Sequence, residues 1–315
     1  SVPSTVNNVT DYWFENESLR ERDPSLGGTL CPLPYRYHVY SAGSDHFMFT
    51  DSTLAVPAVM LNQSRDRFYH TSNDTPDKID PQQMAYVARA LTLSVVTLTY
   101  PSKVSRDVLL TATRNESLDI IRRVGIQGVD DLSNCRSNPE EAYPKYMRWL
   151  GYAFELGRRT LERAQEEWPL ITVQRSLAQA LRASLEMAYT SEMMVLRKAY
   201  EGACVETGLE PKEEGQLRID PSDFGIEIRR RLVYALNPST FTRGKSEMTK
   251  YTSLFRKDPH FMSRVDEMLN LCTEWRSLNE IWDRLCFQFG NIDPHLLSMI
   301  VDDLRELGLV ETREV

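Results

Sequence analysis

Hydrophobic positions in the first hundred residues follow two spacings, that of strands and then that of a helix. The run at 35–40 is aromatic and β-branched and the run at 54–61 is apolar, which predicts a strand at each. Asp80-Pro81 is a helix-start signal, and apolar positions then recur every three or four residues, which predicts an amphipathic helix. We therefore expect an α/β unit over residues 1–102, the end of a mixed sheet flanked by helices. The apolar positions expected to face that sheet are Met84, Val87, Ala88, Leu91 and Val95.

From residue 103 to residue 238 the apolar spacing is almost entirely helical. One long helical run opens at Ser137-Asn138-Pro139, and a second covers about 173–205. Their apolar stripes need partners, so we expect an all-α region that forms a helical bundle or hairpin. Gly, Pro and acidic residues gather at 207–223, which predicts a loop. Three methionines share a helical stripe and are expected in the core: Met187, Met193 and Met194.

Residues 239–315 predict a winged-helix-like module. A first helical face is followed by a turn at Gly290-Asn291 and by a second helix that begins at Asp293-Pro294. Gly308 ends this helix, and 309–313 has the composition of a short strand. Helix, turn, helix and strand in this order are the outline of a winged helix. The positions expected to face inward are Leu278, Ile281, Trp282, Leu285, Leu297, Ile300, Val301, Leu304 and Leu307.

Composition and charge narrow the range of partners. The 315 residues are 41% hydrophobic and 26% charged, which allows a sizeable core. The net charge of −8 argues against general binding to nucleic acid or to an anionic membrane, because attraction to phosphate needs a basic face. The second helix of the C-terminal module carries Asp302, Asp303 and Glu306, which would repel phosphate, and only Arg305 would attract it. A DNA-binding regulator therefore ranks third among the interpretations. We expect no nucleic-acid partner and no membrane partner.

Other features leave the compartment and the assembly open. Five widely spaced cysteines predict neither a zinc ribbon nor a disulfide framework. Five Asn-x-Ser/Thr triplets matter only in a eukaryotic secretory context, and the compartment is left open with a preference for an extracytoplasmic or secreted protein. The sequence does not determine the oligomeric state, and a homo-oligomer is one possibility. The run Arg229-Arg230-Arg231 could form a basic patch with Arg243 and Lys245, but a solvated helix face is the more common outcome and is expected here.

The candidate chemistry lies near the front of the chain. Gly43-Ser44-Asp45-His46 precedes the apolar run at 54–61, and Tyr69-His70-Thr71 follows it, with acidic residues at 74 and 77. An imidazole at the end of a strand is a candidate metal ligand, because zinc binds imidazole nitrogen and carboxylate oxygen. A single histidine in such a loop is more often structural than ligating. The residues alone thus offer His70 as a ligand, with Asp45 and Asp74 as nearby carboxylates.

In combination, the motifs GSDHxxF, VPAVML and YHTxxDTxDxID resemble the end of the catalytic domain in the co-catalytic zinc aminopeptidases, metallopeptidase family 28 of clan MH. The related glutaminyl cyclases have a similar pattern. The resemblance covers roughly residues 30–100. It implies an enzyme that holds two zinc ions, takes a peptide substrate and hydrolyses the N-terminal peptide bond with a zinc-bound hydroxide.

The resemblance also implies roles for individual residues. His70 would be the last zinc ligand, and the Tyr69 phenol would donate a hydrogen bond to the oxyanion of the tetrahedral intermediate. Asp45 and His46 would lie beside the substrate pocket, where Asp45 would orient other groups rather than bind metal. Asp74 would fix the loop or accept a hydrogen bond from the His70 ring.

The chain departs from the family pattern in its set of ligands. In the family, the first His, the bridging Asp, a Glu-Glu pair with the general base and a further Asp all precede the GSDH segment. The residues before Gly43 contain neither a Glu-Glu pair nor a matching His–Asp pair. We therefore expect that the chain is the C-terminal part of a longer enzyme, or that a partner chain completes the site. In both cases the chain alone is expected to be inactive. The alternative is a non-catalytic scaffold that binds protein partners.

Overall fold

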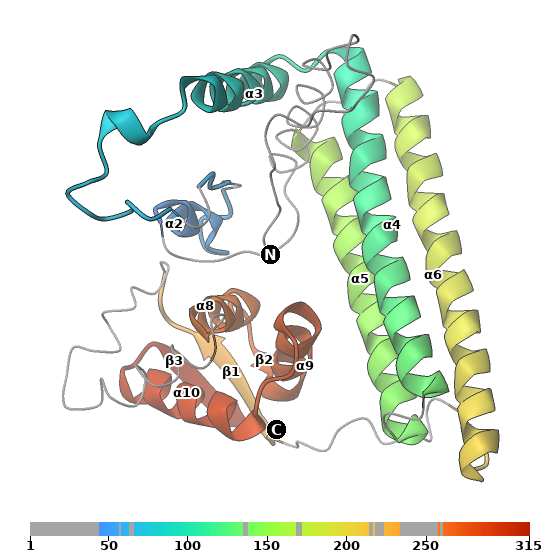
Figure 1. Cartoon of the computed structure of the whole chain (residues 1–315). Helices are drawn as coiled ribbons and strands as arrows, with labels where there is room; N and C mark the ends of the chain where they lie inside the picture. Colours follow the sequence, from blue (N-terminus) through green and yellow to red (C-terminus); the bar gives the residue numbers. More distant parts are fainter. Residues whose placement is uncertain are drawn as a thin grey trace.

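The computed structural model describes residues 44–56, 58–62, 66–134, 138–167, 172–213, 217, 224–233, 258 and 261–315. These residues are mostly helical and form an N-terminal segment, a helical bundle and a C-terminal module with a small sheet (Figure 1). No helix among them is both long enough and apolar enough to span a membrane. The strand expected at 35–40 lies outside the described residues.

The α/β unit expected at the front of the chain is not found, and this prediction is wrong for the described residues. Between residues 44 and 102, no strand is present in the described part. The segment 54–61, expected as a buried strand, has irregular backbone, and Leu54, Val56 and Met60 are exposed. A strand is stabilised by hydrogen bonds to a neighbouring strand, and in the described part of the chain none lies beside this segment.

The N-terminal segment contains two short helical elements and one long helix: α2 (His46–Thr50), η1 (Pro76–Lys78) and α3 (Pro81–Thr99). The expected start of α3 is confirmed, because the Asp80 carboxylate accepts hydrogen bonds from the backbone N of Gln82 at 2.8 Å and of Gln83 at 3.3 Å.

The buried face of α3 differs from the expected one. Met84 and Val95, both expected to face a sheet, are 55% and 59% exposed. A different stripe is buried: Tyr86, Ala90, Ser94 and Thr97. Of the stripe that predicted an α/β packing, only Val87 is partly buried, and the other four positions are exposed.

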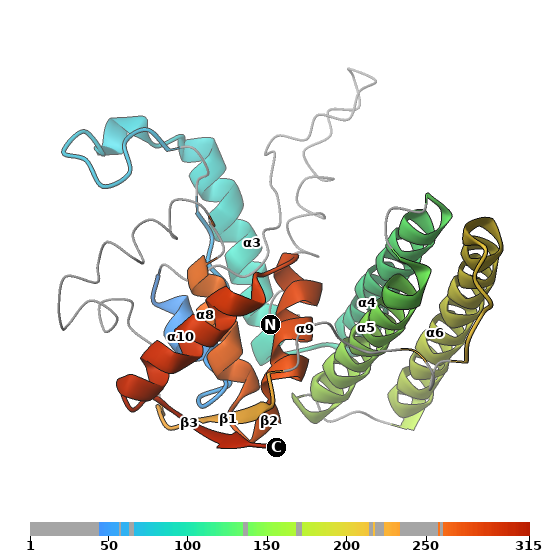
Figure 2. The same cartoon turned by 90° about the horizontal axis from the view of Figure 1, so that it is seen from below.

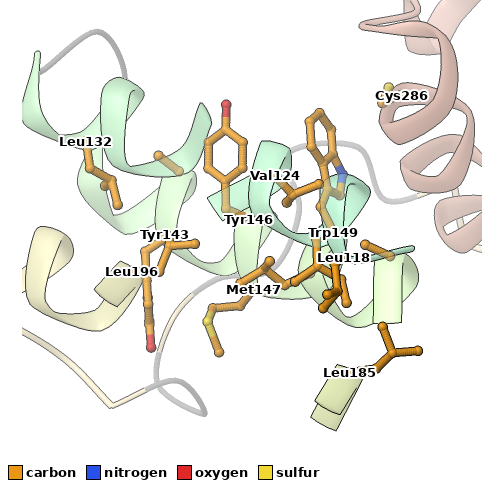
Figure 3. Packing of buried hydrophobic residues seen from close by; sticks show 14 of the residues in the cluster. Leu118, Val124, Leu132, Tyr143, Tyr146, Met147, Trp149, Leu185, Leu196 and Cys286 are labelled. Carbon is orange, nitrogen blue, oxygen red and sulfur yellow. The ribbon is translucent and has the colours of Figure 1, made fainter. Parts of the chain in front are cut away.

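Three long helices form the bundle: α4 (Lys103–Ser133), α5 (Pro139–Glu167) and α6 (Thr172–Thr207). Each packs against the other two around one apolar core (Figures 1 and 2). Asn138 caps α5 where the sequence predicts a start, since its Oδ1 accepts from Glu140 N at 3.1 Å. Figure 3 shows the core side chains, among them Leu118, Val124, Leu132, Tyr143, Tyr146, Met147, Trp149, Leu185 and Leu196.

Two details of the bundle were not anticipated. Gly157 of α5 lies so close to α4 that a Cβ built there would be 2.7 Å from the Ser117 Cβ. Met187 and Met194, expected in the core, are 71% and 66% exposed on α6, whereas Met193 packs against the core. The helical stripe that holds all three methionines is wide, and the bundle covers only part of it.

The C-terminal module is built from β1 (Ile226–Arg230), α8 (Phe261–Leu271), β2 (Arg276–Ser277), α9 (Leu278–Phe289), α10 (Pro294–Glu306) and β3 (Val310–Glu314). Its sheet is antiparallel with strand order β2-β1-β3, and Ile228 is in register with Thr312. The winged-helix-like unit over 239–315 stays a prediction, and the sheet next to its helices also includes β1, which comes from residues before 239.

Most apolar positions expected to face inward in the module do so. Its core includes Leu278, Ile281, Leu285, Leu297, Ile300, Val301 and Leu304. Leu307 is 47% exposed, because α10 ends at Glu306 and Leu307 is its C-cap. Gly290 and Gly308, with φ of 79° and 70°, end α9 and α10 in the left-handed region that glycine adopts without strain.

The module is joined to the bundle around a buried carboxylate. Asp283 of α9 accepts hydrogen bonds from Arg148 Nε at 2.9 Å, Arg148 Nη2 at 3.2 Å and Trp149 Nε1 at 3.2 Å, all from α5. Burial and the Asp283 charge raise the pKa of Tyr152, one turn further along α5, well above its ordinary value. Trp149 also meets Phe287 edge-on, with ring centroids 6.0 Å apart.

Candidate functional site

His70 lies in a turn rather than at the end of a strand. Thr71 closes the turn, since its backbone N and its Oγ1 donate to the Phe68 carbonyl at 2.9 and 2.6 Å. The Phe68 N in turn donates to Asp66 Oδ1 at 2.8 Å. His70 itself has φ of 59°, a left-handed conformation that is uncommon for residues other than glycine. His70 is exposed in this turn.

Tyr69 and His70 present their rings together. The two rings are stacked with centroids 3.8 Å apart and an interplanar angle of 20°. Both residues are exposed, Tyr69 to 58%. The loop therefore offers an imidazole and a phenol side by side, the first able to bind a metal ion and the second able to donate a hydrogen bond.

The acidic residues that follow, Asp74 and Asp77, make local hydrogen bonds within the loop and the neighbouring turn. Asp74 is exposed and its backbone N donates to the Thr71 carbonyl at 3.2 Å. Within the described residues, no hydrogen bond joins Asp74 to His70. Asp77 accepts from Lys78 Nζ and from Thr75 Oγ1, and these hydrogen bonds, that of Lys78 first, lower the pKa of Asp77.

Asp45 and His46 lie at the start of α2. Asp45 occupies the N-cap position and is exposed, but its side chain makes no capping hydrogen bond. His46, the first residue of the helix, is half-buried. The helix leads directly into Asp51, which is buried and paired with Arg230 of β1 through contacts of 3.1 Å.

The described residues do not form a zinc site by themselves. Protein zinc sites use three or four ligands, and among the described residues no group of three or more His, Cys, Asp or Glu is placed to hold a metal ion. The loop with Tyr69 and His70 projects outward, away from α2 (Figures 1 and 2). The structure thus brings Tyr69 and His70 together, whereas Asp45, His46 and Asp74 do not converge on them.

Sequence reasoning missed the pair formed by Asp51 and Arg230. Arg230 belongs to a run of three arginines that was expected on a solvated helix face, but it ends a strand and is 6% exposed. The available signal was the two-residue period of a strand, which places Arg230 on the same face as Ile226 and Ile228. Asp51 carried a weaker signal, an Asp two residues before Thr53 at the end of a helix.

Comparison with known proteins agrees with the resemblance seen in the motifs. Residues 10–95 match the model of Peptidase family M28. The match covers less than a third of the chain, and its first part, 10–43, lies outside the described residues. It includes Asp45, His46, Tyr69, His70 and Asp74. No curated protein and no solved structure matches the chain.

Proposed function

We propose, on the premise that residues 10–95 belong to Peptidase family M28, that this chain supplies the C-terminal part of the catalytic domain of a zinc-dependent aminopeptidase-like hydrolase. The family match supports a metallopeptidase-type function in general. The observation that carries the finer proposal is the exposed stack of Tyr69 on His70 inside the matched segment. The proposed substrate is a peptide with a free N-terminus.

The bare apolar surfaces of the N-terminal segment support this proposal. Met84, Leu91 and Val95 lie along one side of α3 and are exposed, as are Leu54 and Val56 in the segment expected as a strand. Each pattern is typical of an element packed on a sheet. A sheet supplied from outside the described residues would cover both, and it would also give the segment 54–61 a strand to pair with.

Within the proposed site, the residues of this chain have distinct roles. His70 would contribute one imidazole ligand, and Tyr69 would donate its phenol proton in a hydrogen bond to the developing oxyanion. Asp45 and His46 would line the substrate pocket, and Asp74 would hold the loop. When bound in such sites, zinc polarises the carbonyl and lowers the pKa of water. Because the described residues lack a full ligand set, we assign the other ligands and the general base to a segment or partner chain outside them.

Zinc content of the complete protein, together with its activity, tests the proposal. The protein that carries the whole site should hold about two zinc ions per molecule. His70→Ala should lower the zinc content by about one ion and aminopeptidase activity by about a hundredfold or more, because an imidazole ligand is lost. The measurements are metal analysis of the purified protein and hydrolysis of leucine 4-nitroanilide.

His295→Ala is the matched control, because His295 is exposed at the start of α10 in the other module. This variant should keep both the zinc and the activity. A complete protein without zinc, in which His70→Ala changes nothing, would contradict the enzymatic proposal. That result would favour the non-catalytic scaffold, which the lack of converging donors among the described residues already makes the second candidate.

A further inference from the structure

The turn that follows α2 is compact and fully hydrogen-bonded. The Asp51 carbonyl accepts from Leu54 N at 2.9 Å and from Ala55 N at 2.7 Å, and Asp51 Oδ1 accepts from Thr53 N at 2.9 Å. Ala55 has φ of 54°, a left-handed conformation that persists only where the surroundings determine it. No residue of α2 is itself buried, whereas Asp51 is 5% exposed. The turn is therefore fixed by hydrogen bonds, whereas the neighbouring helix α2 has no buried residue that would hold it in place.

Arg230 fixes this turn from the C-terminal module. Its Nη1 and Nη2 both donate to Asp51 Oδ2 at 3.1 Å, and its Nε donates to the Leu232 carbonyl at 2.8 Å. The backbone N of Arg230 donates to the Cys272 carbonyl at 2.7 Å. The guanidinium is thus held by its own module and presents two donors to one carboxylate, which is a geometry specific to arginine.

Further contacts from two parts of the molecule converge on the same turn. Asn270 of α8 accepts from Ser52 N at 2.9 Å, and the Val233 carbonyl accepts from Thr53 Oγ1 at 2.5 Å. From the bundle, Arg163 Nη2 donates to the Ala55 carbonyl at 2.6 Å. Residues 51–55 are therefore the place where the N-terminal segment is joined to both other parts.

The carboxyl group next to the pair of Arg230 and Asp51 is mainly protonated below about pH 7. Asp266 of α8 is buried beside the pair, and its Oδ2 has no hydrogen-bond partner in the described part of the chain. Burial, then the charges of Asp51 and Glu267, raise the pKa of Asp266 to about 7, although Arg230 opposes this shift. A neutral Asp266 does not compete with Asp51 for the guanidinium.

We infer that Arg230 is a positioning residue for the peptidase pocket: it fixes the turn at 51–55 and, through α2, the place of Asp45 and His46. The helix has five residues, His46–Thr50, so a displacement of Asp51 is carried to its other end. The link to catalysis rests on the proposed function, whereas the anchoring rests on the contacts alone. In this view the C-terminal module is a structural part of the peptidase rather than an appended binding domain.

Amide hydrogen exchange of the chain tests the anchoring without any activity. The backbone N–H groups of residues 52–56 all donate hydrogen bonds, so their exchange reports on the turn. Arg230→Met should accelerate their exchange by about tenfold or more, because the ion pair is lost, while the amides of α5 keep their rate. Arg230→Lys, which retains the charge, should stay closer to the unaltered chain. Arg229→Met is the matched control, since Arg229 is the adjacent strand residue and is paired with Glu311 at 2.7 Å on the other face.

Unchanged exchange at 52–56 in a folded Arg230→Met variant would overturn the inference. Arg230→Met could instead unfold the C-terminal module, which would be seen as fast exchange in α8 and α10. In that case Asp51→Asn is the variant that tests the anchoring. It removes the same ion pair from the other side and leaves the Arg230 bond to the Leu232 carbonyl in place. The same acceleration at 52–56 is expected, and its absence would count against the inference.

Kinetics of the complete zinc-loaded protein test the link to the pocket. For leucine 4-nitroanilide, Arg230→Met should raise KM by about tenfold with little change in kcat, because substrate-pocket residues are displaced while the ligands stay. Zinc content should not change, and Arg230→Lys should restore part of the loss. Faster exchange at 52–56 with an unchanged KM would overturn the positioning role. A complete protein with neither zinc nor activity would defeat the proposed function, and the exchange data would still show whether Arg230 holds α2.

Discussion

Three buried aspartates among the described residues differ in their partners. Asp51 and Asp283 each face an arginine, Arg230 and Arg148, with N–O contacts of 3.1 and 2.9 Å. Asp266 is 7% exposed and has no such partner of its own among the described residues. Ionisation of Asp266 therefore lowers the stability of the folded state, because a buried charge without a dedicated partner is unfavourable.

Asp266→Asn should stabilise the protein above neutral pH. The folded pKa of Asp266 is about 7 against an ordinary value of 3.8, so the folded chain keeps a proton that the unfolded chain releases. The contribution of Asp266 to stability is therefore present below about pH 4 and is lost as pH rises toward about pH 7. At pH 8 the variant should exceed the unaltered chain by about 2–4 kcal/mol, and at pH 4 the difference should be small.

Urea unfolding at several pH values measures this effect. Asp302→Asn is the control, because Asp302 is exposed on α10 and its replacement should change stability by less than about 0.5 kcal/mol at any pH. An equal effect of Asp266→Asn at pH 4 and pH 8 would show that Asp266 does not hold a proton in the folded state.

Helices α4 and α5 are in close contact where Gly157 faces Ser117. Ser117 Oγ is satisfied within α4, since it donates to the Thr113 carbonyl at 2.8 Å. A methyl group on Gly157 would lie 2.7 Å from Ser117 Cβ and 3.4 Å from Leu185 Cδ1 of α6. All three helices of the bundle therefore meet around the missing side chain.

Two glycine-to-alanine changes on α5 separate helix propensity from packing. Alanine is favoured over glycine inside a helix by about 0.8–1.0 kcal/mol. Gly151→Ala should show most of that gain, because no atom lies within 4 Å of the added Cβ. Gly157→Ala should destabilise the bundle by about 1–3 kcal/mol, because backbone-fixed atoms must move apart. Thermal unfolding followed by circular dichroism compares the two, and equal shifts of Tm would show that the helices separate freely at Gly157.

Helix boundaries were the part of the fold most open to prediction. The starts of α3, α5 and α10 were read from Asp80, Asn138 and Asp293, and each of these side chains accepts a backbone hydrogen bond in the structure. Such caps depend on a few neighbouring residues, so local sequence contains the information. The strand expected at 54–61 failed for the opposite reason, since a strand depends on a distant neighbour that local sequence does not identify.

At the scale of the whole molecule, two ion pairs join the C-terminal module to the other described parts. The module contributes the cation in the pair of Arg230 with Asp51 and the anion in the pair of Asp283 with Arg148. The two pairs span 179 and 135 positions of the chain. No periodicity relates residues so far apart, and this is why sequence reasoning predicted neither pair and expected Arg230 on a solvated face.

Asp283→Ala should uncouple the module from the bundle. The substitution leaves Arg148 and the Trp149 indole without their acceptor, and loss of one member of a buried pair costs about 3–5 kcal/mol. We expect urea unfolding to change from one transition to two, because the module should unfold before the bundle. Exchange of the amides of the module identifies the first transition. Trp149 fluorescence should shift at the first transition, because its Nε1 donates to Asp283 at 3.2 Å.

Glu280→Ala, one turn away on α9, is the matched control. Glu280 has a side chain 37% exposed and pairs with Arg276 and Arg284 of the same module. It should reduce stability by less than about 1 kcal/mol and keep the single transition. A single transition in Asp283→Ala as well would show that the apolar contacts of Trp149 and Phe287 are enough to join the parts.

The topology of the small sheet has a consequence for the order of assembly during synthesis. Its central strand, β1, pairs along its full length with β3, and the described residues between them include α8, α9 and α10. The high contact order of this pairing makes it a late event. Helices α4, α5 and α6 all precede β1 in the chain and can pack together before the module has left the ribosome. Until β3 emerges, Arg230 has no completed sheet to hold it. Helix α2 is thus expected to reach its final position only at the last stage of folding.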